Sequence, residues 1–178
     1  MEVFSGETGP TIERLVNFLN RHNAAILKKV EEPLACFDVD ETLLEWDEND
    51  MSMRRNTVCA LYDTAVKNGY KIYIVTARPK SENGLKYLMK QLAALGFDTS
   101  VIQKVYMMPS TYDDVGVYKS DARARIVQQT AGTFVLMVGD QATDVLRNTK
   151  NMKFDSNLTY VLEKPDKDVI FGVKVSEV

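Results

Sequence analysis

The chain contains 178 residues, of which 45% are hydrophobic and 26% charged, and its formal net charge is −3. A chain of this length is expected to fold as one domain that buries roughly two-thirds of its unfolded surface. The small negative charge gives no sign of the broad basic surface that tight, non-specific binding to long nucleic acid requires.

The composition also bears on the cellular setting. The first residues lack both the basic start and the long apolar core of a secretory signal. No apolar run approaches the ~20 residues that a bilayer-spanning helix needs, so we expect a cytoplasmic protein with no membrane partner. Two cysteines, Cys36 and Cys59, are too few for a disulfide framework. We interpret both as structural thiols in a reducing compartment.

Hydrophobic periodicity predicts helices that alternate with strands. Such alternation is typical of a three-layer, Rossmann-like α/β sandwich with a central parallel sheet and right-handed crossovers. We predict one domain over residues 1–178, in which residues 1–32 form an N-terminal helical extension packed on the core. The expected elements are a helix at 10–30, a strand at 34–38, an acidic loop at 43–50, a helix at 51–68, a strand at 71–75, a helix at 79–95, a strand at 105–108, a helix at 119–129, a strand at 133–138, a short helix after 144, a strand at 158–162 and a weakly patterned tail.

Two carboxylates, Asp38 and Asp40, follow the first expected strand. Residues two apart in an extended chain lie on the same side, so both acids are expected in one pocket at the carboxyl edge of the sheet, where open α/β sheets bind ligands. Two like charges this close require a cation or a proton between them. A hard divalent cation such as Mg²⁺ fits the oxygen ligands. Alone, this segment also fits a solvated acidic turn, and the only histidine, His22, is expected on a helix surface, which excludes a histidine metal cluster.

Three further polar groups follow later elements: Thr76 after the second strand, Lys119 before a helix, and Gly139-Asp140 with Asp144 after the fourth. Together with Asp38-Val-Asp40-Glu-Thr42, this set resembles the four motifs of the haloacid dehalogenase-like superfamily, specifically its phosphatase branch. The resemblance spans about Leu34 to Asp144. It implies a phosphomonoester hydrolase with the fold described above.

Charge considerations and the resemblance assign a role to each motif residue. Asp38 is the expected nucleophile, which forms an aspartyl-phosphate. Asp40 is the expected general acid and then general base. In the family that the chain resembles, an aspartate at this position goes with phosphatases and phosphotransferases, which argues against a dehalogenase. Mg²⁺ is expected to bind the carboxylates of Asp38 and Asp140, with Asp144 as a ligand or as a residue that orients bound waters. The resemblance adds the backbone carbonyl of Asp40 as a metal ligand. Thr76 and Lys119 are expected to contact the phosphoryl oxygens.

Each of the weaker assignments has a structural alternative. Thr76 also fits a residue that caps a strand end. Lys119 competes with Lys104 from the same interval. An aspartate at the position of Asp144 also complements a helix dipole.

Two residues are candidates for substrate contact only. Arg78 fits either the rim of a phosphate site or an exposed salt bridge. Trp46, in the acidic loop, fits either stacking on a base or sugar or ordinary packing.

The intervals from Asp38 to Thr76 and from Thr76 to Lys119 are each filled by one helix and one strand, which leaves no room for a large cap domain. The chain is therefore similar to cap-less members, including those like acid phosphatases and polynucleotide 3′-phosphatases. An uncovered site suits a bulky substrate such as a nucleic-acid end or a phosphoprotein. In a homo-oligomer a neighbouring subunit could cover the site, which would then suit a phosphorylated small molecule. Alternatives that use the same residues are a polynucleotide 3′-phosphatase and a nucleotide phosphotransferase. A non-catalytic binding module is a further alternative, against which the retention of every motif residue argues.

Overall fold

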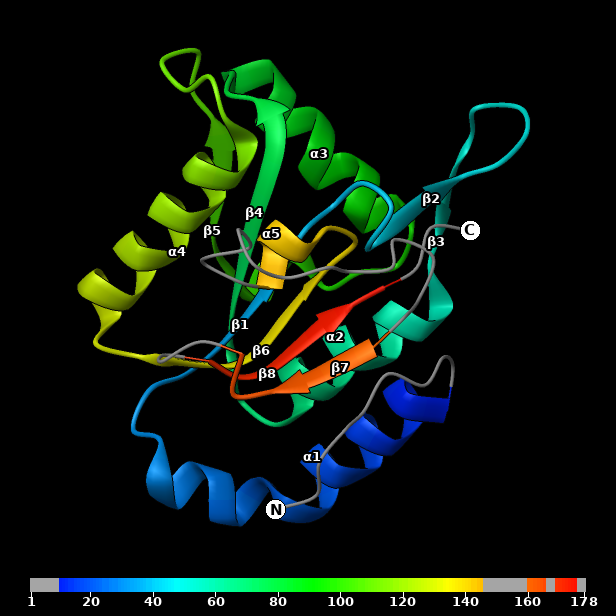
Figure 1. The fold of residues 1–178 in the computed structure, drawn as a ribbon. Coiled ribbons are helices and arrows are strands. Elements are labelled where there is room, and N and C mark those ends of the chain that lie inside the picture. Colours follow the sequence, from blue (N-terminus) through cyan, green and yellow to red (C-terminus); the bar gives the residue numbers. More distant parts are fainter. Residues whose placement is uncertain (1–9, 146–159, 166–168, 176–178) are drawn as a thin grey trace.

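A six-stranded sheet forms the centre of the molecule in a computed structural model that describes residues 10–145, 160–165 and 169–175 (Figure 1). The strand order is β5-β4-β1-β6-β8-β7. The first five strands in this order run parallel, and β7 pairs antiparallel with β8. The strands are β1 (Pro33–Phe37), β4 (Lys71–Pro79), β5 (Ile102–Met108), β6 (Thr133–Gly139), β7 (Tyr160–Glu163) and β8 (Val169–Lys174).

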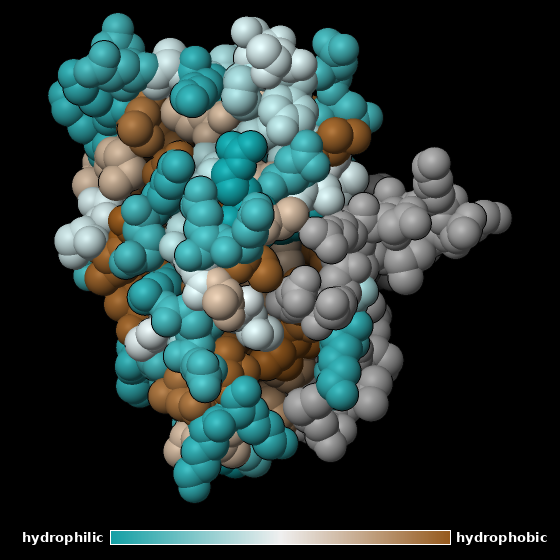
Figure 2. Space-filling model, turned by 90° about the vertical axis from the view of Figure 1, so that its left-hand side faces the viewer, coloured by the Kyte–Doolittle hydropathy of each residue, from teal (hydrophilic) through white to brown (hydrophobic). Residues whose placement is uncertain are grey.

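Helices cover both faces of this sheet, which gives the predicted three-layer α/β sandwich. Apolar side chains of α1, α2 and α3 pack on one face, and those of α4 and α5 on the other. Hydrophilic side chains stand out over the α4 side, with hydrophobic residues showing between them (Figure 2). The helices are α1 (Pro10–Lys29), α2 (Asn56–Lys67), α3 (Glu82–Ala94), α4 (Val115–Thr130) and α5 (Ala142–Val145), with a 3₁₀ turn at Thr99–Val101.

The alternation of side chains along β1 decides which layer the first motif faces. Ala35 and Phe37 pack with the α1–α3 layer, whereas Leu34 and Cys36 pack with the α4 layer. All are nearly inaccessible to water, and a fully buried Leu or Phe contributes about 1.5–3 kcal/mol relative to an exposed one. Asp38 continues the register of Leu34 and Cys36, so its side chain is directed to the α4 layer.

The helix predicted at 51–68 is wrong in its first turn. A short antiparallel hairpin, β2 (Leu44–Trp46) with β3 (Ser52–Arg54), occupies the segment that was expected to be an acidic loop and the start of a helix. The carboxylate of Asp47 accepts hydrogen bonds from the backbone N–H groups of Asn49 and Met51, at 2.9 and 2.8 Å. This local bonding stabilises a turn in place of a helix, so α2 begins only at Asn56.

The boundary between β4 and α3 also differs from the prediction. The strand continues past Thr76 to Pro79, and Lys80 N–H still bonds the carbonyl of Met108 at 2.9 Å. Ser81 is the N-cap of α3, since its hydroxyl accepts from Gly84 N–H at 2.9 Å. The helix therefore starts after its cap at Ser81 and not at Pro79, although proline is common in the first turn of helices.

The C-terminal part contains a strand that the weak pattern of the tail did not predict. β8 lies between β6 and β7, and β7 adds one antiparallel strand to the edge of the predicted central parallel sheet. Residues 158 and 159 of the strand expected at 158–162 lie outside the described residues. Within the described parts of the chain, no helix combines the length and apolar character needed to cross a bilayer.

The N-terminal helix packs on the core through one apolar stripe. Ile12, Leu15 and Leu19 recur at helical spacing and join the core of the α1–α3 layer. His22 lies on the exposed part of the helix, where its ring centroid is 4.5 Å from that of Phe18. The prediction that His22 is a surface residue is therefore confirmed, whereas the single-domain boundary 1–178 stays a prediction.

We expect Leu19→Ala to lower the free energy of unfolding by about 2–5 kcal/mol, because it removes a fully buried side chain and leaves a cavity. The control is Asn17→Ala, an exposed position on the same helix, which we expect to change stability by less than about 0.5 kcal/mol. Urea denaturation followed by circular dichroism measures both. Equal effects of the two substitutions would contradict the docking of α1 through Leu19.

Candidate active site

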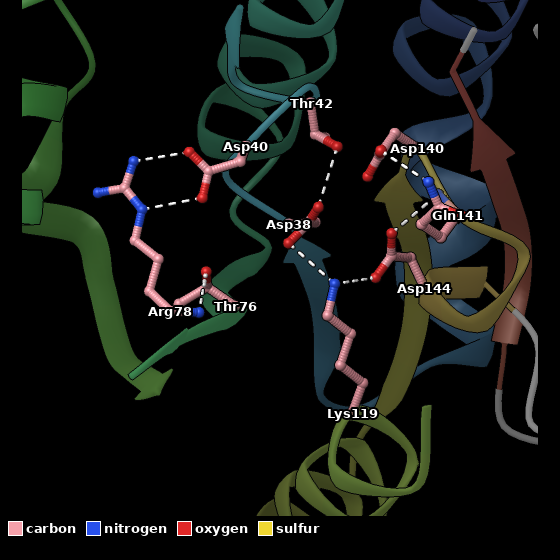
Figure 3. Close-up of polar contacts among 9 residues, drawn as sticks. All are labelled: Asp38, Asp40, Thr42, Thr76, Arg78, Lys119, Asp140, Gln141 and Asp144. Atoms are coloured by element: carbon pink, nitrogen blue, oxygen red, sulfur yellow. Dashed lines mark hydrogen bonds and ion pairs between the residues drawn. The ribbon is translucent and has the colours of Figure 1, made fainter. Parts of the chain in front are cut away.

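Three carboxylates meet at the carboxyl ends of neighbouring strands (Figure 3). Asp38 follows β1 and Asp140 follows β6, and these two strands pair in parallel. The backbone N–H of Asp38 bonds the carbonyl of Val138 at 3.0 Å, which fixes one loop against the other. One oxygen each of Asp38, Asp140 and Asp144 lies within 4.8 Å of the other two. The structure thus brings together acids that are about a hundred residues apart in sequence.

The ammonium group of Lys119 lies between two of these carboxylates. Its Nζ is 3.0 Å from Asp38 Oδ1 and 2.5 Å from Asp144 Oδ1. Lys119 lies inside α4 and not directly before it, so the predicted helix start at 119 is wrong by four residues. The rival residue, Lys104, is exposed on β5, with Nζ 4.7 Å from the ring centroid of Tyr106. The geometry therefore favours Lys119 as the site lysine.

Burial determines the electrostatics of this cluster. Asp38, Lys119, Asp140 and Asp144 are each at most 8% exposed. Burial, followed by repulsion from Asp144, raises the pKa of Asp38 well above its ordinary value. Burial lowers the pKa of Lys119, but attraction to Asp38 and Asp144 outweighs this effect and raises it, so the ammonium stays charged. The ammonium of Lys119 thus contacts two of the three clustered carboxylates, those of Asp38 and Asp144, and a divalent cation would neutralise the remaining negative charge.

The turn around α5 orients Asp144. Gln141 N–H donates to Asp144 Oδ2 at 3.0 Å, and Asp144 N–H donates to the Gln141 carbonyl at 3.0 Å. The side-chain amide of Gln141 donates to Asp140 Oδ2 at 3.1 Å. Gln141 was not predicted as a site residue, because nothing in its spacing distinguishes it from a loop glutamine. Asp144 points into the cluster and contacts Lys119. Its carboxylate is therefore placed to bind a cation, in addition to complementing the helix dipole.

A tight turn brings the first motif back over β1. Glu41 adopts φ +58°, a left-handed conformation that reverses the chain, and Leu44 N–H bonds the Val39 carbonyl at 3.1 Å. Arg55 Nη1 donates a hydrogen bond to the Glu41 carbonyl at 2.6 Å. As a result the Thr42 hydroxyl reaches Asp38 Oδ2 at 3.4 Å.

Asp40 faces away from the carboxylate cluster and pairs with Arg78 (Figure 3). Arg78 donates to both carboxylate oxygens, through Nε at 2.9 Å and Nη2 at 2.7 Å. These hydrogen bonds raise the pKa of Arg78. The expectation that both carboxylates share one pocket is therefore wrong for the Asp40 side chain, because both of its oxygens bond Arg78 and neither belongs to the carboxylate cluster. Of the two alternatives for Arg78, the structure shows the salt bridge, and contact with a phosphate stays a prediction.

Two neighbours hold Arg78 in this position. Its Nη1 donates to Gln91 Oε1 of α3 at 3.0 Å, and its backbone N–H donates to Thr76 Oγ1 at 3.2 Å. Thr76 is 1% exposed on β4, and this contact uses an oxygen lone pair, not the hydroxyl proton. Gln91 was not predicted, since an amphipathic helix contains many such polar residues.

Two other residues of interest lie outside this network. Trp46 ends β2 and is 40% exposed on the hairpin, so its contact with substrate stays a prediction. Cys36 is buried beneath the site, and burial, more than any neighbouring charge, raises its pKa to about 12. Burial also raises the pKa of Cys59, to about 11. Both thiols thus stay protonated at neutral pH, as expected for structural cysteines.

The glycine of the last motif leaves room for Asp144. A Cβ atom on Gly139 would lie 2.1 Å from Asp144 Cβ and 2.4 Å from its Oδ2. For wild type we expect Mg²⁺ at a hundredfold excess over Kd to stabilise the fold by about 2.7 kcal/mol. We expect Gly139→Ala to displace Asp144 and to abolish this stabilisation. Thermal unfolding with and without Mg²⁺ measures this.

The control for that variant is Gly69→Ala, where φ is +81° but no atom lies within 4 Å of the new Cβ. This substitution strains the backbone away from the site, so it should lower stability and keep the Mg²⁺ effect. Equal Mg²⁺ stabilisation of Gly139→Ala and wild type would contradict a cation site at Asp144.

The sequence and the fold match known proteins. Residues 45–165 match the family described as HAD superfamily, subfamily IIIB (acid phosphatase). Among solved structures, a class C acid phosphatase from Bacillus anthracis with tungstate bound has the same fold, with a TM-score of 0.52 and 17% identity. That match covers 68% of this chain and 56% of the other. No curated protein sequence matches the chain. Since the family match covers more than half of the residues, the chain belongs to the haloacid dehalogenase superfamily, subfamily IIIB, the acid phosphatases.

Proposed function

We propose that the protein hydrolyses phosphate monoesters in a Mg²⁺-dependent reaction through an aspartyl-phosphate on Asp38. The observation that supports this most directly is the buried cluster of Asp38, Asp140 and Asp144 around the Lys119 ammonium. Family membership supports the general activity. The matched residues begin after Thr42, so the roles of Asp38 and Asp40 depend on the geometry and on the motif.

The donor set fits a hard divalent cation. The carboxylates of Asp38, Asp140 and Asp144 would hold Mg²⁺, together with the backbone carbonyl of Asp40 that the resemblance implies. When bound, Mg²⁺ neutralises negative charge on a phosphoryl group and on the carboxylate that attacks it. The side chain of Asp40 lies outside this donor set, since both of its oxygens face Arg78.

Asp38 is held in position for attack on phosphorus. Its backbone N–H is fixed by Val138, and its two oxygens contact Lys119 and Thr42. In the first step an Asp38 oxygen forms a bond to phosphorus while the bond from phosphorus to the ester oxygen breaks. In the second step water attacks the same phosphorus and releases phosphate and the Asp38 carboxylate. Lys119, kept charged by its neighbours, supplies positive charge to the phosphoryl oxygens.

Asp40 is the proposed proton donor to the leaving oxygen, and then the proton acceptor from water. In the structure both of its oxygens are engaged by Arg78. Proton transfer therefore requires that at least one of these two bonds opens when substrate binds. The Asp40 carboxylate is 41% exposed, which leaves it accessible to an incoming ester.

The surroundings of the site favour an open approach. The segment between β1 and α2 contains only the β2–β3 hairpin. The two intervals in which other family members carry a cap domain, 38–76 and 76–119, are fully described here and contain none. A phosphorylated small molecule and a nucleic-acid end are both proposed as substrates of this site. An assay that includes both classes, with a 3′-phosphorylated oligonucleotide as the second, distinguishes them.

We expect wild type to hydrolyse p-nitrophenyl phosphate with Mg²⁺ and to lose this activity with EDTA. Asp38→Asn removes the nucleophile without a change of shape and should lower kcat by more than about 10³-fold. Asp63→Asn, an exposed position on α2, is the control and should leave kcat unchanged. Near wild-type turnover by Asp38→Asn would place the nucleophile elsewhere.

The role of Asp40 predicts a dependence on the leaving group. Asp40→Asn should slow hydrolysis of an alkyl phosphate by about 10²–10⁴-fold. It should slow p-nitrophenyl phosphate much less, because a nitrophenolate leaves without protonation. Steady-state kcat/KM over a series of aryl and alkyl phosphates measures this. The same loss for every leaving group would show that Asp40 acts only on the structure of the site.

A further inference from the structure

A second cavity lies on the other side of α4 from the carboxylate cluster, against the edge strand β5. Its volume is about 110 Å³, which gives room for several waters or one small oxyanion. The polar and aromatic residues that line it are Lys80, Lys104, Tyr106, Tyr112, Tyr118 and Arg125.

Three cations from three different segments surround this cavity. Lys80 follows β4, Lys104 lies on β5 and Arg125 lies on α4. Within the described parts of the chain, none of the three forms an ion pair with a carboxylate, and no acidic side chain lines the cavity. Like charges gathered in one place repel each other, and an anion between them removes this repulsion.

A buried hydroxyl supplies the second observation. Tyr118 is only 4% exposed, and its hydroxyl has no hydrogen-bond partner in the structure. By contrast, Tyr106 donates to Gln129 at 3.3 Å and Tyr112 donates to Asp121 at 3.0 Å. A buried polar group without a partner costs free energy, and a water or a ligand that accepts a hydrogen bond from the Tyr118 hydroxyl would recover it.

The protonation of this hydroxyl makes it a donor. Burial, followed by the neighbouring hydroxyls of Tyr112 and Tyr106, raises the pKa of Tyr118. It therefore keeps its proton at neutral pH and matches a ligand that accepts hydrogen bonds. The nearby carboxylate of Asp121 is engaged by Tyr112.

We propose that this cavity binds an oxyanion of the phosphate type, which accepts a hydrogen bond from Tyr118 and is surrounded by Lys80, Lys104 and Arg125. The site is distinct from the carboxylate cluster, although the two adjoin. Tyr118 and Lys119 are consecutive on α4 and so lie about 100° apart around the helix. Lys119 faces Asp38, while Tyr118 lines the cavity.

Titration with inorganic phosphate, followed by NMR of ¹³C-labelled tyrosine rings, tests the proposal on the whole chain. We expect saturable shifts of the Tyr106, Tyr112 and Tyr118 signals in wild type. In Lys104→Glu/Arg125→Glu the affinity should fall by about tenfold or more, since two cationic partners are replaced by anions. No saturable shift in wild type, or equal affinity in this variant, overturns the proposal.

Two further variants separate this effect from net charge and from folding. Lys67→Glu/Lys90→Glu changes the net charge by the same amount at exposed positions of α2 and α3, and should bind phosphate as wild type does. Tyr118→Phe removes only the unpartnered hydroxyl. It should weaken phosphate by about three- to tenfold without lowering the melting temperature. Unchanged affinity in Tyr118→Phe overturns the role of its hydroxyl.

The anion can come from solution or from a second phosphate group on a substrate, and kinetics distinguishes the two sources. The test compares kcat/KM for the mono- and bisphosphate of one alkanediol. A preference for the bisphosphate that Lys104→Glu/Arg125→Glu abolishes assigns the anion to the substrate. Phosphate binding without such a preference assigns it to free phosphate. The binding experiment needs no turnover, so its outcome is independent of the proposed hydrolysis.

Discussion

The attraction between one buried ammonium and the carboxylates around it is the constraint on which the arrangement of the site depends. Charges removed from water are costly unless partners compensate them. Here Lys119 from α4 reaches Asp38 after β1 and Asp144 in α5. Helix, strand and turn must therefore keep their register, because a shift of any one would leave a buried charge unpaired. A compensating cation fits at the same place, since three carboxylates outnumber the single lysine.

Two acids that are neighbours in sequence occupy different environments. Asp38 is buried in the cluster, whereas Asp40 is turned outward and pairs with Arg78. The chain reverses directly after Asp40, at the left-handed residue Glu41. Environments that differ in this way suit identical side chains to different roles, here the nucleophile and the proton donor that we propose. Gln91 of α3 contributes to this difference, because its side-chain oxygen accepts a hydrogen bond from Arg78, the residue that pairs with Asp40.

The sheet and the convergence of acids were predictable for a physical reason. Short apolar runs that end in polar residues indicate buried parallel strands, and parallel strands bring their carboxyl ends to one edge. The order of polar residues thus predicted that Asp38, Asp140 and Asp144 lie close together. Lys119 contacts the carboxylate cluster, although the predicted helix boundary beside it was wrong by four residues. The contact of Thr76 with a phosphoryl group stays a prediction.

Other parts depend on contacts that sequence patterns do not contain. The hairpin at residues 44–54 is stabilised by one carboxylate that bonds to two backbone N–H groups of its own turn. β8 is rich in β-branched and aromatic residues, but its place between β6 and β7 depends on a pairing that its sequence alone does not give. The Arg78–Asp40 pair joins residues 38 positions apart, and periodicity gives no information on which cation a given acid meets.

The position of β8 has a consequence for synthesis of the protein. This strand pairs with β6 from Phe134 to Gly139, and Val175 N–H bonds the Gly139 carbonyl directly before Asp140. A nascent chain emerges from the ribosome N-terminus first, so β6, which pairs with β1 on one side, remains an edge strand on its other side until β8 (Val169–Lys174) has been translated. The residue directly before Asp140 therefore acquires its backbone partner on this side only after Val175, 35 positions beyond Asp140, has been made.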